Sequence, residues 1–204
     1  MYVLKSLPYS YNALEPYIST RTVTIHHEKH HKGYLDKLNI ALNKVNFDFS
    51  HSILWVIQNI DNFPLSLRGD ILYNAGGVLN HDLYFEILSS NKNNEPKGIL
   101  KDEINKEFGS FENFREEFIK SALSVVGSGW TFLVLNKDKK LQIINTSNQE
   151  TPYLYGFTPI IGLDLWEHSY YLDYQNNKNQ YIDNFFLLLD FDRIENLYEE
   201  TYKK

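Results

Sequence analysis

The chain has 204 residues, of which 43% are hydrophobic and 23% charged, as in an ordinary globular protein long enough to bury a substantial core. Its net charge of −6 argues against binding to nucleic acid, and the absence of cysteine excludes disulfides, thiolate nucleophiles and thiolate metal ligands. The N-terminus lacks the pattern of a signal peptide, and no apolar run approaches the roughly 18 residues that span a bilayer. We therefore expect a cytoplasmic protein without membrane contact.

The first part of the chain predicts two long helices. After an extended, proline-punctuated segment at residues 1–19, Ser19 or Thr20 can cap a helix that begins near Arg21 and continues through residues 34–43. We expect this helix to be one of the two arms of a helical N-terminal region.

The second arm is predicted at residues 66–90, after a short amphipathic segment at 52–60. Its apolar side chains cover an arc wide enough for extensive burial. Gly76 and Gly77 lie in its middle, where each glycine costs about 1 kcal/mol relative to alanine. The glycine pair therefore indicates that another part of the protein packs closely against this helix.

The second part of the chain predicts further helices around a small sheet. The polar, asparagine-rich segment 90–98 is the expected junction, which gives domains at 1–89 and 90–204. Two β-rich runs around a charged turn at 130–147 predict a hairpin, and 158–166 predicts a third strand. Ser110 is placed as an N-cap. Helical patterns occupy residues 99–107, 111–123, 167–175, 180–191 and 193–202.

Four of the seven histidines lie within "HHEKHH", residues 26–31, with Tyr34 close behind. His26, His30 and Tyr34 have the spacing i, i+4, i+8 and form one stripe of a helix. His27 and His31 fall on the neighbouring stripe, which we expect to lie nearer to solvent, and we interpret them as packing or surface residues. By itself the cluster is compatible with a solvated face, an adventitious metal patch or one arm of a built metal site.

Three residues elsewhere bear on this choice. His81 lies on the second long helix, and His168 follows Asp164 by four residues. A lone histidine on an apolar face is usually a core residue, but a carboxylate directly after the apolar run "PIIGL" needs a partner, and a metal ion is one. Three imidazoles and one carboxylate suit Mn, Fe, Co or Zn. A catalytic zinc hydrolase fits the same ligand set.

The motifs "IHHEKHHKGY", "NAGGVLNH" and "DLWEHSYYLDYQN", in this order, resemble the iron/manganese superoxide dismutase family. The resemblance covers nearly the whole chain and includes "LPYSYNALEPYI", "GSGWTFLVL" and "NTSNQETP". It implies an α+β fold, in which a long antiparallel helical hairpin precedes an α/β domain with a three-stranded antiparallel sheet. It also implies an oxidoreductase that converts superoxide to O₂ and H₂O₂.

The resemblance further implies a metal ligated by His26, His81, Asp164 and His168, with solvent as a fifth ligand opposite His26. One metal per subunit would cycle between the 3+ and 2+ states while the bound solvent carries a proton. Gln149, in "NQETP", matches the glutamine of manganese-type members, and iron-type members more often carry theirs where this chain has Gly77. Manganese is therefore the expected cofactor, with an iron-dependent or cambialistic enzyme as the alternative.

Other matching positions imply roles around that metal. Tyr34 and His30 match the pair at the entrance, where Tyr34 relays protons through Gln149. Trp130 and Trp166 match the aromatic wall that keeps the site dry. Glu167 and Tyr171 match residues that reach the partner's site in a homodimer, with a tetramer as the alternative. Lys29 and Lys178 are our candidates for attracting the superoxide anion.

The chain departs from the family pattern at three positions. Phe85 and Phe132 stand where tryptophan is common, and Asp82 stands where serine or threonine is common. The side chain of Asp82 points about 100° from that of His81 around a helix, so we do not expect Asp82 to be a ligand. Two other functions remain: a zinc hydrolase, which would need a general base beside the bound water, and a non-catalytic structural member of the fold, which would not need the four ligands.

Overall fold

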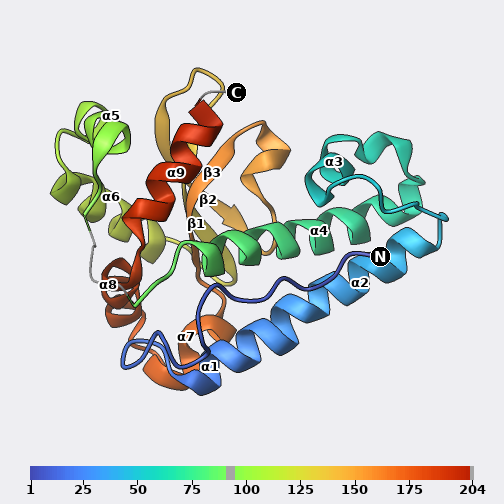
Figure 1. Ribbon diagram of the computed structural model, residues 1–204, viewed down its shortest axis with the longest axis horizontal. Helices are drawn as coiled ribbons and strands as arrows, with labels where there is room; N and C mark the ends of the chain where they lie inside the picture. The colour runs from blue at the N-terminus through green and yellow to red at the C-terminus, as the bar shows by residue number, and fades with distance from the viewer. Residues whose placement is uncertain (91–94, 203–204) are drawn as a thin grey trace.

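Two long helical segments run side by side in the computed structural model, which describes residues 1–90 and 95–202 (Figure 1). One segment comprises α1 (Thr20–Ile25), a π-helical turn (His26–His31) and α2 (Lys32–Asn43), and the other is α4 (Leu65–Glu86). They run in opposite directions, and α2 packs against α4. The predicted antiparallel helical hairpin is therefore confirmed.

The first arm is not the continuous α-helix that the sequence predicts. It begins as predicted, because the Ser19 hydroxyl accepts a hydrogen bond from the backbone of Thr22 at 3.2 Å. At His26–His31, however, the backbone widens into a π-helix, in which the N–H of Lys32 donates to the carbonyl of His27, five residues earlier. Such turns are rare and occur mostly at functional sites. The prediction of a regular helix here was wrong.

The second arm ends four residues earlier than predicted. Between the arms lie α3 (Ile53–Gln58) and a 3-10 turn (Ile60–Asn62). After Glu86 the chain leaves the helix because Leu88 forms an isolated β-bridge with Leu189, far along the sequence. The N–H of Ser89 donates to the carbonyl of Leu188 at 2.8 Å. This tertiary pairing replaces the last predicted helical turn.

The junction predicted at 90–98 falls partly on residues 91–94, which lie outside the described residues, as do 203 and 204. After it come α5 (Gly98–Phe108) and α6 (Phe111–Leu123), each within one residue of its predicted bounds. Ser110 is the N-cap of α6, and its hydroxyl accepts a hydrogen bond from the backbone of Asn113 at 3.1 Å.

The sheet has three antiparallel strands in the order β2-β1-β3. The central strand β1 (Gly129–Leu135) pairs with β2 (Leu141–Ser147) and with β3 (Thr158–Asp164). The third strand was predicted to reach residue 166, but it ends at Asp164, where the backbone N–H of Trp166 turns back to the Asp164 carboxylate. A 3-10 turn (Pro152–Tyr155) precedes β3, and α7 (Glu167–Tyr174), α8 (Lys178–Leu188) and α9 (Phe191–Tyr202) complete the chain.

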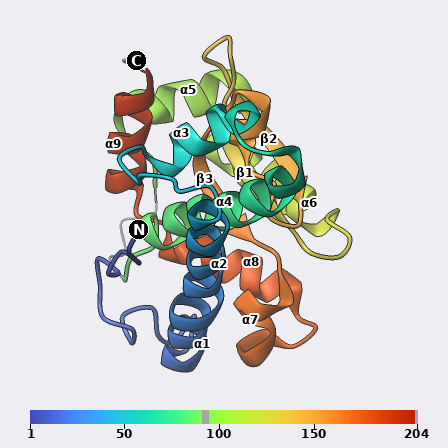
Figure 2. The same cartoon turned by 90° about the vertical axis from the view of Figure 1, so that its right-hand side faces the viewer.

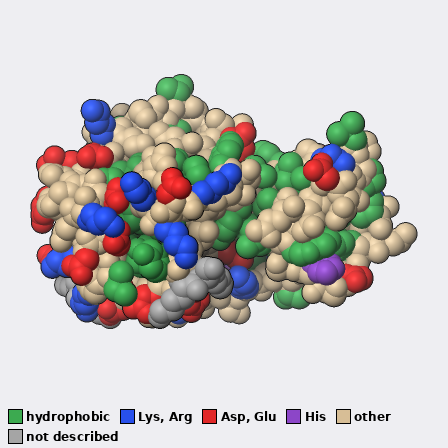
Figure 3. Space-filling model, turned by 90° about the horizontal axis from the view of Figure 1, so that it is seen from above, with side chains coloured by type: hydrophobic (Ala, Val, Ile, Leu, Met, Phe, Trp, Pro, Cys, Tyr) green, Lys and Arg blue, Asp and Glu red, His purple; other side chains and the backbone are tan. Residues whose placement is uncertain are grey.

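Two hydrophobic clusters hold this arrangement together. One surrounds the sheet and its helices, and the other lies within the hairpin among α2, α3 and α4. The view along the hairpin shows α1 and α2 below α4, with the strands above it (Figure 2). Because α4 also packs against β3, it connects the hairpin to the sheet. The surface in Figure 3 carries charges of both signs over the C-terminal part. Among the described helices, none combines the length and hydropathy needed to cross a bilayer.

Candidate metal centre

Three imidazole nitrogens converge on one carboxylate oxygen where the hairpin meets the sheet. The Nε2 atoms of His26 and His168 lie 3.1 Å from Oδ2 of Asp164, and that of His81 lies 3.5 Å from it. The four potential ligand atoms lie within 4.8 Å of one another. The π-turn, α4, the end of β3 and the start of α7 therefore bring together the four side chains that the sequence singled out.

Burial keeps two of the imidazoles neutral, and the neighbouring histidines keep the carboxylate ionised. His26, His81 and Asp164 are at most 1% exposed, and the side chain of His168 is 11% exposed. Burial lowers the pKa of His26 to about 4 and that of His81 well below its usual value. Burial alone would raise the pKa of Asp164, but the charge and hydrogen bond of His168, together with those of His26, lower it below its usual range. Neutral imidazoles and an ionised carboxylate are the ligand forms that bind metal.

The backbone fixes the orientation of two of the four side chains. Nδ1 of His81 donates to the carbonyl of Gly77 at 2.6 Å, which leaves the Nε2 lone pair free. This Nε2 atom is buried and has no hydrogen-bond partner among the described residues. The backbone N–H of Trp166 donates to Oδ1 of Asp164 at 2.8 Å, so Oδ2 faces the histidines. An orphaned nitrogen within a set of three nitrogens and one oxygen fits a first-row transition metal ion.

A buried hydrogen-bond chain lies beside these four residues. Nε1 of Trp130 donates to Oε1 of Gln149 at 3.1 Å, and Nε2 of Gln149 donates to the hydroxyl of Tyr34 at 3.0 Å. Trp130 and Gln149 are fully buried and Tyr34 is 8% exposed. The rings of Trp130 and Tyr34 lie 5.1 and 5.3 Å from that of His81. Gln149 is thus held between an indole and a phenol, next to the histidine cluster.

The glycine pair in α4 makes this chain possible. A Cβ atom on Gly77 would lie 2.6 Å from Cγ of Tyr34, and one on Gly76 would lie 2.1 Å from the carbonyl oxygen of Gln149. Both distances are too short for any side chain to fit without displacing its neighbour. The close packing predicted from the two glycines is therefore confirmed, and it is Tyr34 and Gln149 that pack there.

A cavity of about 520 Å³ borders the cluster, and we call its opening the mouth. The residues that line this cavity include His30, Tyr34, Trp166, Glu167, His168 and Lys178. The ring of His30 stacks on that of His168 at 4.0 Å, and the ring of Trp166 stacks on that of His168 at 5.5 Å. A small solute that enters this cavity meets the rings of His30, Tyr34 and Trp166 beside His168.

Comparison with known proteins agrees with this arrangement. Residues 1–89 match the α-hairpin domain of the iron/manganese superoxide dismutases, and residues 96–197 match their C-terminal domain. The chain is 43% identical over 200 residues to a superoxide dismutase [Mn/Fe] of Methylomonas sp. (strain J), a match that covers 98% of each chain. The chain belongs to the iron/manganese superoxide dismutase family. It is accordingly an oxidoreductase, and its substrate is superoxide.

Residues that the dismutase resemblance assigns to a subunit interface lie on the surface around the mouth. Glu167 is exposed in the first turn of α7, and Tyr171 is 49% exposed one turn later. The two lysines proposed for substrate attraction differ in position. Lys178 lines the mouth and donates to the carbonyl of Val125 at 3.2 Å, whereas Lys29 is exposed on the π-turn and does not belong to the described lining of the mouth.

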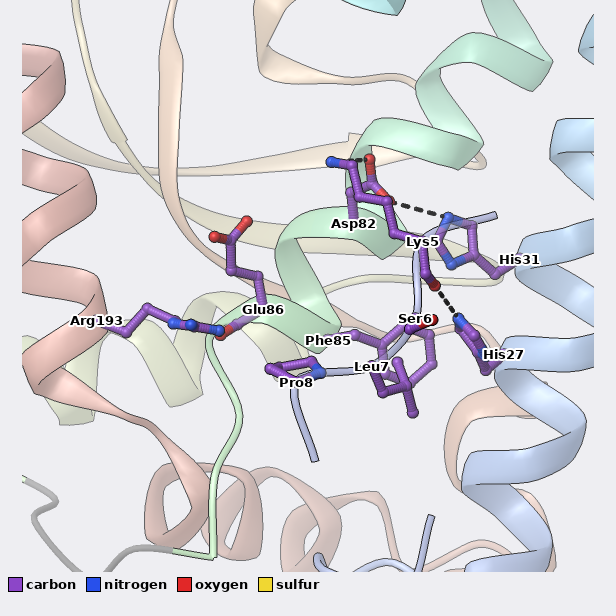
Figure 4. A pocket seen from close by; sticks show the side chains of 10 residues that line it. All are labelled: Lys5, Ser6, Leu7, Pro8, His27, His31, Asp82, Phe85, Glu86 and Arg193. Atoms are coloured by element: carbon purple, nitrogen blue, oxygen red, sulfur yellow. Dashed lines mark hydrogen bonds and ion pairs between the residues drawn. The ribbon is translucent and has the colours of Figure 1, made fainter. Parts of the chain in front are cut away.

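The expectation that His27 and His31 lie near solvent is wrong, because they are 3% and 2% exposed. The N-terminal segment covers them: Nε2 of His27 donates to the carbonyl of Lys5 at 2.9 Å (Figure 4). Nε2 of His31 lies 3.3 Å from Asp82, which in turn pairs with Lys5 at 2.8 Å. Asp82 thus faces a cavity of about 180 Å³ between that segment and α4, and it is not one of the four clustered residues, as predicted.

Two tyrosines near the centre escaped the sequence analysis. The hydroxyl of Tyr181 donates to the backbone carbonyl of Asp164 at 2.9 Å and so helps to fix the end of β3. The ring of Tyr73 lies 6.0 Å from that of Tyr34. The sequence does place Tyr73 four residues before Gly77, which is one helical turn from the point where Tyr34 packs, and this spacing could have indicated Tyr73. No sequence pattern pointed to Tyr181, whose contact depends on the tertiary fold.

Proposed function

We propose that this dismutase uses one manganese ion per subunit, held by His26, His81, Asp164 and His168. The single observation that carries the proposal is the convergence of these side chains within 4.8 Å, with the buried Nε2 of His81 lacking any other partner among the described residues. A bound manganese ion would supply one-electron redox chemistry between its 3+ and 2+ states. An iron-dependent or cambialistic enzyme is the alternative.

The choice of manganese rests on Gln149 and Gly77. Of the two positions that can supply the glutamine in the family pattern, this chain has glutamine at 149 and glycine at 77. A glutamine side chain at position 77 would overlap Tyr34. Both polar atoms of the Gln149 side-chain amide are hydrogen-bonded: its oxygen accepts from Trp130 and its nitrogen donates to Tyr34. An amide held in this way can orient groups at the metal and adjust its potential.

Protons for the second half-reaction are assigned to Tyr34. Reduction of superoxide consumes one electron and two protons to give H₂O₂. Burial is the main factor that raises the pKa of Tyr34 above its usual value, so its phenol holds a proton throughout the neutral range. Gln149 positions that phenol by donating to its oxygen. The part played by bound solvent as a second proton carrier stays a prediction.

The other proposed roles follow from position. Trp130 and Trp166 exclude water from the centre, and His30 narrows the mouth by stacking on His168. Glu167 and Tyr171 are exposed beside the mouth, where a second copy of the chain would cover them in the proposed homodimer. A tetramer is the alternative assembly. The cytoplasmic location expected from the sequence stays a prediction, which cell fractionation would test.

The experiment is reconstitution of the metal-free protein with manganese and with iron in parallel, followed by superoxide dismutation per bound ion. We expect high activity with manganese and little with iron. Equal activity with both would show that the enzyme is cambialistic and that Gln149 does not select the metal. Stoichiometric binding of manganese without activity would contradict the proposed chemistry while leaving the ligand set intact.

A further inference from the structure

A largely buried carboxylate lies next to the metal centre without belonging to it. Asp82 directly follows the proposed ligand His81 in α4, and its side chain is 14% exposed. It stands where serine or threonine is common in the family, so its charge is a departure of this chain from the family pattern. The proposed ligand set leaves this charge without a role.

The two carboxylate oxygens of Asp82 contact different partners (Figure 4). Oδ2 pairs with Nζ of Lys5 at 2.8 Å, and the side chain of Lys5 is 71% exposed. Oδ1 lies 3.3 Å from Nε2 of His31, whose side chain is 3% exposed. The carboxylate thus has an inner oxygen towards the buried histidine and an outer oxygen towards the N-terminal segment.

His31 connects this carboxylate to the metal centre. Its ring stacks on that of His81, with the centroids 5.4 Å apart and the planes inclined at 21°. Its Nδ1 atom is buried and has no hydrogen-bond partner among residues 1–90 and 95–202. A second proton on this ring would therefore be buried without an acceptor, which is costly. His31 is uncharged in this arrangement and does not cancel the charge of Asp82.

The ammonium group of Lys5 cancels the charge of Asp82 only in part. It contacts the outer oxygen and lies mostly in water, which screens it, whereas the carboxylate is largely buried. The net field of the pair at His81 is therefore negative. By Coulomb's law, a negative field stabilises a metal ion in the 3+ state more than in the 2+ state.

We propose that Asp82 lowers the reduction potential of the metal centre. The proposal rests on the proposed manganese site, of which His81 is one ligand. Asp82 is not a ligand and touches no substrate, so it acts at a distance, through its charge. Lys5 moderates this effect from the N-terminal segment, because it neutralises part of that charge.

The test is the midpoint potential of the manganese-loaded enzyme, from a mediated redox titration followed by the visible absorption of the oxidised ion. Asp82→Asn keeps the shape of the side chain and removes its charge. The affinity for the 3+ state relative to the 2+ state should fall on the order of tenfold, which raises the potential by about 59 mV for one electron. Lys5→Gln removes the opposing charge, so the potential should fall, on the order of threefold or about 28 mV.

The opposite directions separate a charge effect from a packing role. Both substitutions break the same ion pair, so a merely structural tether would shift the potential in one direction in both variants. Asp82→Glu keeps the charge and can extend into the cavity of about 180 Å³ that Asp82 lines, so its potential should stay near the original value. Lys5→Gln alters only an exposed side chain, and it decides the question even if Asp82→Asn loses its metal.

Asp61→Asn is the matched control. It removes the same charge from a carboxylate that is also paired, in this case with Arg68. Arg68 precedes His81 along α4 by about 20 Å, at a rise of about 1.5 Å per residue. The potential of this variant should equal that of the unaltered enzyme.

Four results would overturn the proposal. Shifts in the same direction in Asp82→Asn and Lys5→Gln would reduce the pair to a tether of the N-terminal segment. A shift in Asp82→Asn alone would show that Asp82 acts by holding His31 and not by its charge. If the unaltered enzyme binds manganese and dismutates superoxide but no variant shifts its potential, only the role of Asp82 is wrong. If the unaltered enzyme binds no manganese or shows no reversible couple, the proposed function is wrong, and the role of Asp82 with it.

Discussion

At the scale of single residues, the tightest packing beside the metal centre occurs at two glycines of α4, Gly76 and Gly77. Gly77 accommodates the ring of Tyr34 and Gly76 the backbone of Gln149, so two neighbouring glycines allow both residues of the proposed proton path to approach α4. The glycines were visible in the sequence as a weakness of the helix. What they accommodate was not, because Tyr34 and Gln149 come from other parts of the chain.

Gly77→Ala should therefore damage both stability and turnover. The new Cβ would lie 2.6 Å from Cγ of Tyr34, so the ring must move away from its hydrogen bond with Gln149. We expect the free energy of unfolding to fall by about 1–3 kcal/mol, measured by urea denaturation, and kcat to fall with it. Gly69→Ala is the control, since it lies in the same helix with nothing within 4 Å of its added Cβ. It should leave kcat unchanged and stabilise the protein by up to about 1 kcal/mol, and equal losses in both variants would contradict the steric explanation.

The histidine cluster shows how far residue patterns reach. Spacing placed His26, His30 and Tyr34 on one stripe, and His30 and Tyr34 do line the mouth. Spacing failed for His27 and His31, because whether a neighbouring stripe meets water depends on what covers it. Here Lys5 and its neighbours cover it, and nothing in helical periodicity predicts that an extended N-terminal segment folds back over the helix.

At the scale of elements, the sequence predicted the order and type of the helices and strands well but not all of their ends. Ends set by local chemistry were found, as at Ser19 and Ser110. Ends set by distant partners were missed, as at Leu88, which pairs with Leu189. The π-turn at His26–His31 was also missed, because a widened turn has no strong local signature in the sequence.

Ser110→Ala should weaken α6 without affecting the metal centre. The Ser110 hydroxyl satisfies the backbone N–H of Asn113 in the first turn, and alanine leaves that donor to water. Loss of such a cap costs about 1 kcal/mol, which lowers the melting temperature of a chain of this size by about 2–4 °C. Differential scanning calorimetry at constant metal content measures this. Ser110→Asp, which can cap, should restore most of the loss, and a failure to do so would assign the effect to something other than capping.

At the scale of the whole molecule, the charge of the protein and that of its substrate oppose each other. The chain carries a net charge of −6 and superoxide is an anion, so a rapid encounter requires a locally positive approach. Lys178 lies in the lining of the mouth, and Lys29 does not. The sequence could not distinguish these two lysines as candidates for attracting superoxide, because only the folded chain shows which residues line the mouth.

Lys178→Glu should lower kcat/KM on the order of tenfold at low ionic strength and reverse its dependence on salt. In the unaltered enzyme added salt screens the attraction and lowers kcat/KM, since the Debye length falls to about 10 Å at 0.1 M. In Lys178→Glu salt screens a repulsion, so kcat/KM should rise. Lys29→Glu changes the net charge equally but outside the mouth, and its effect should be much smaller. Equal effects of the two substitutions would show that overall charge, and not a funnel at the mouth, governs the encounter.

The same lysine predicts an effect of pH. Burial lowers the pKa of Lys178, so its positive charge is present below this lowered pKa and is lost at a lower pH than that of an exposed lysine. The attraction should therefore fade early on the alkaline side, and kcat/KM should fall there. Lys178→Gln has no charge to lose, so its kcat/KM should begin lower and lack this fall. Persistence of the same alkaline fall in Lys178→Gln would assign it to another group, such as Tyr34, and leave the salt dependence as the only evidence for attraction by Lys178.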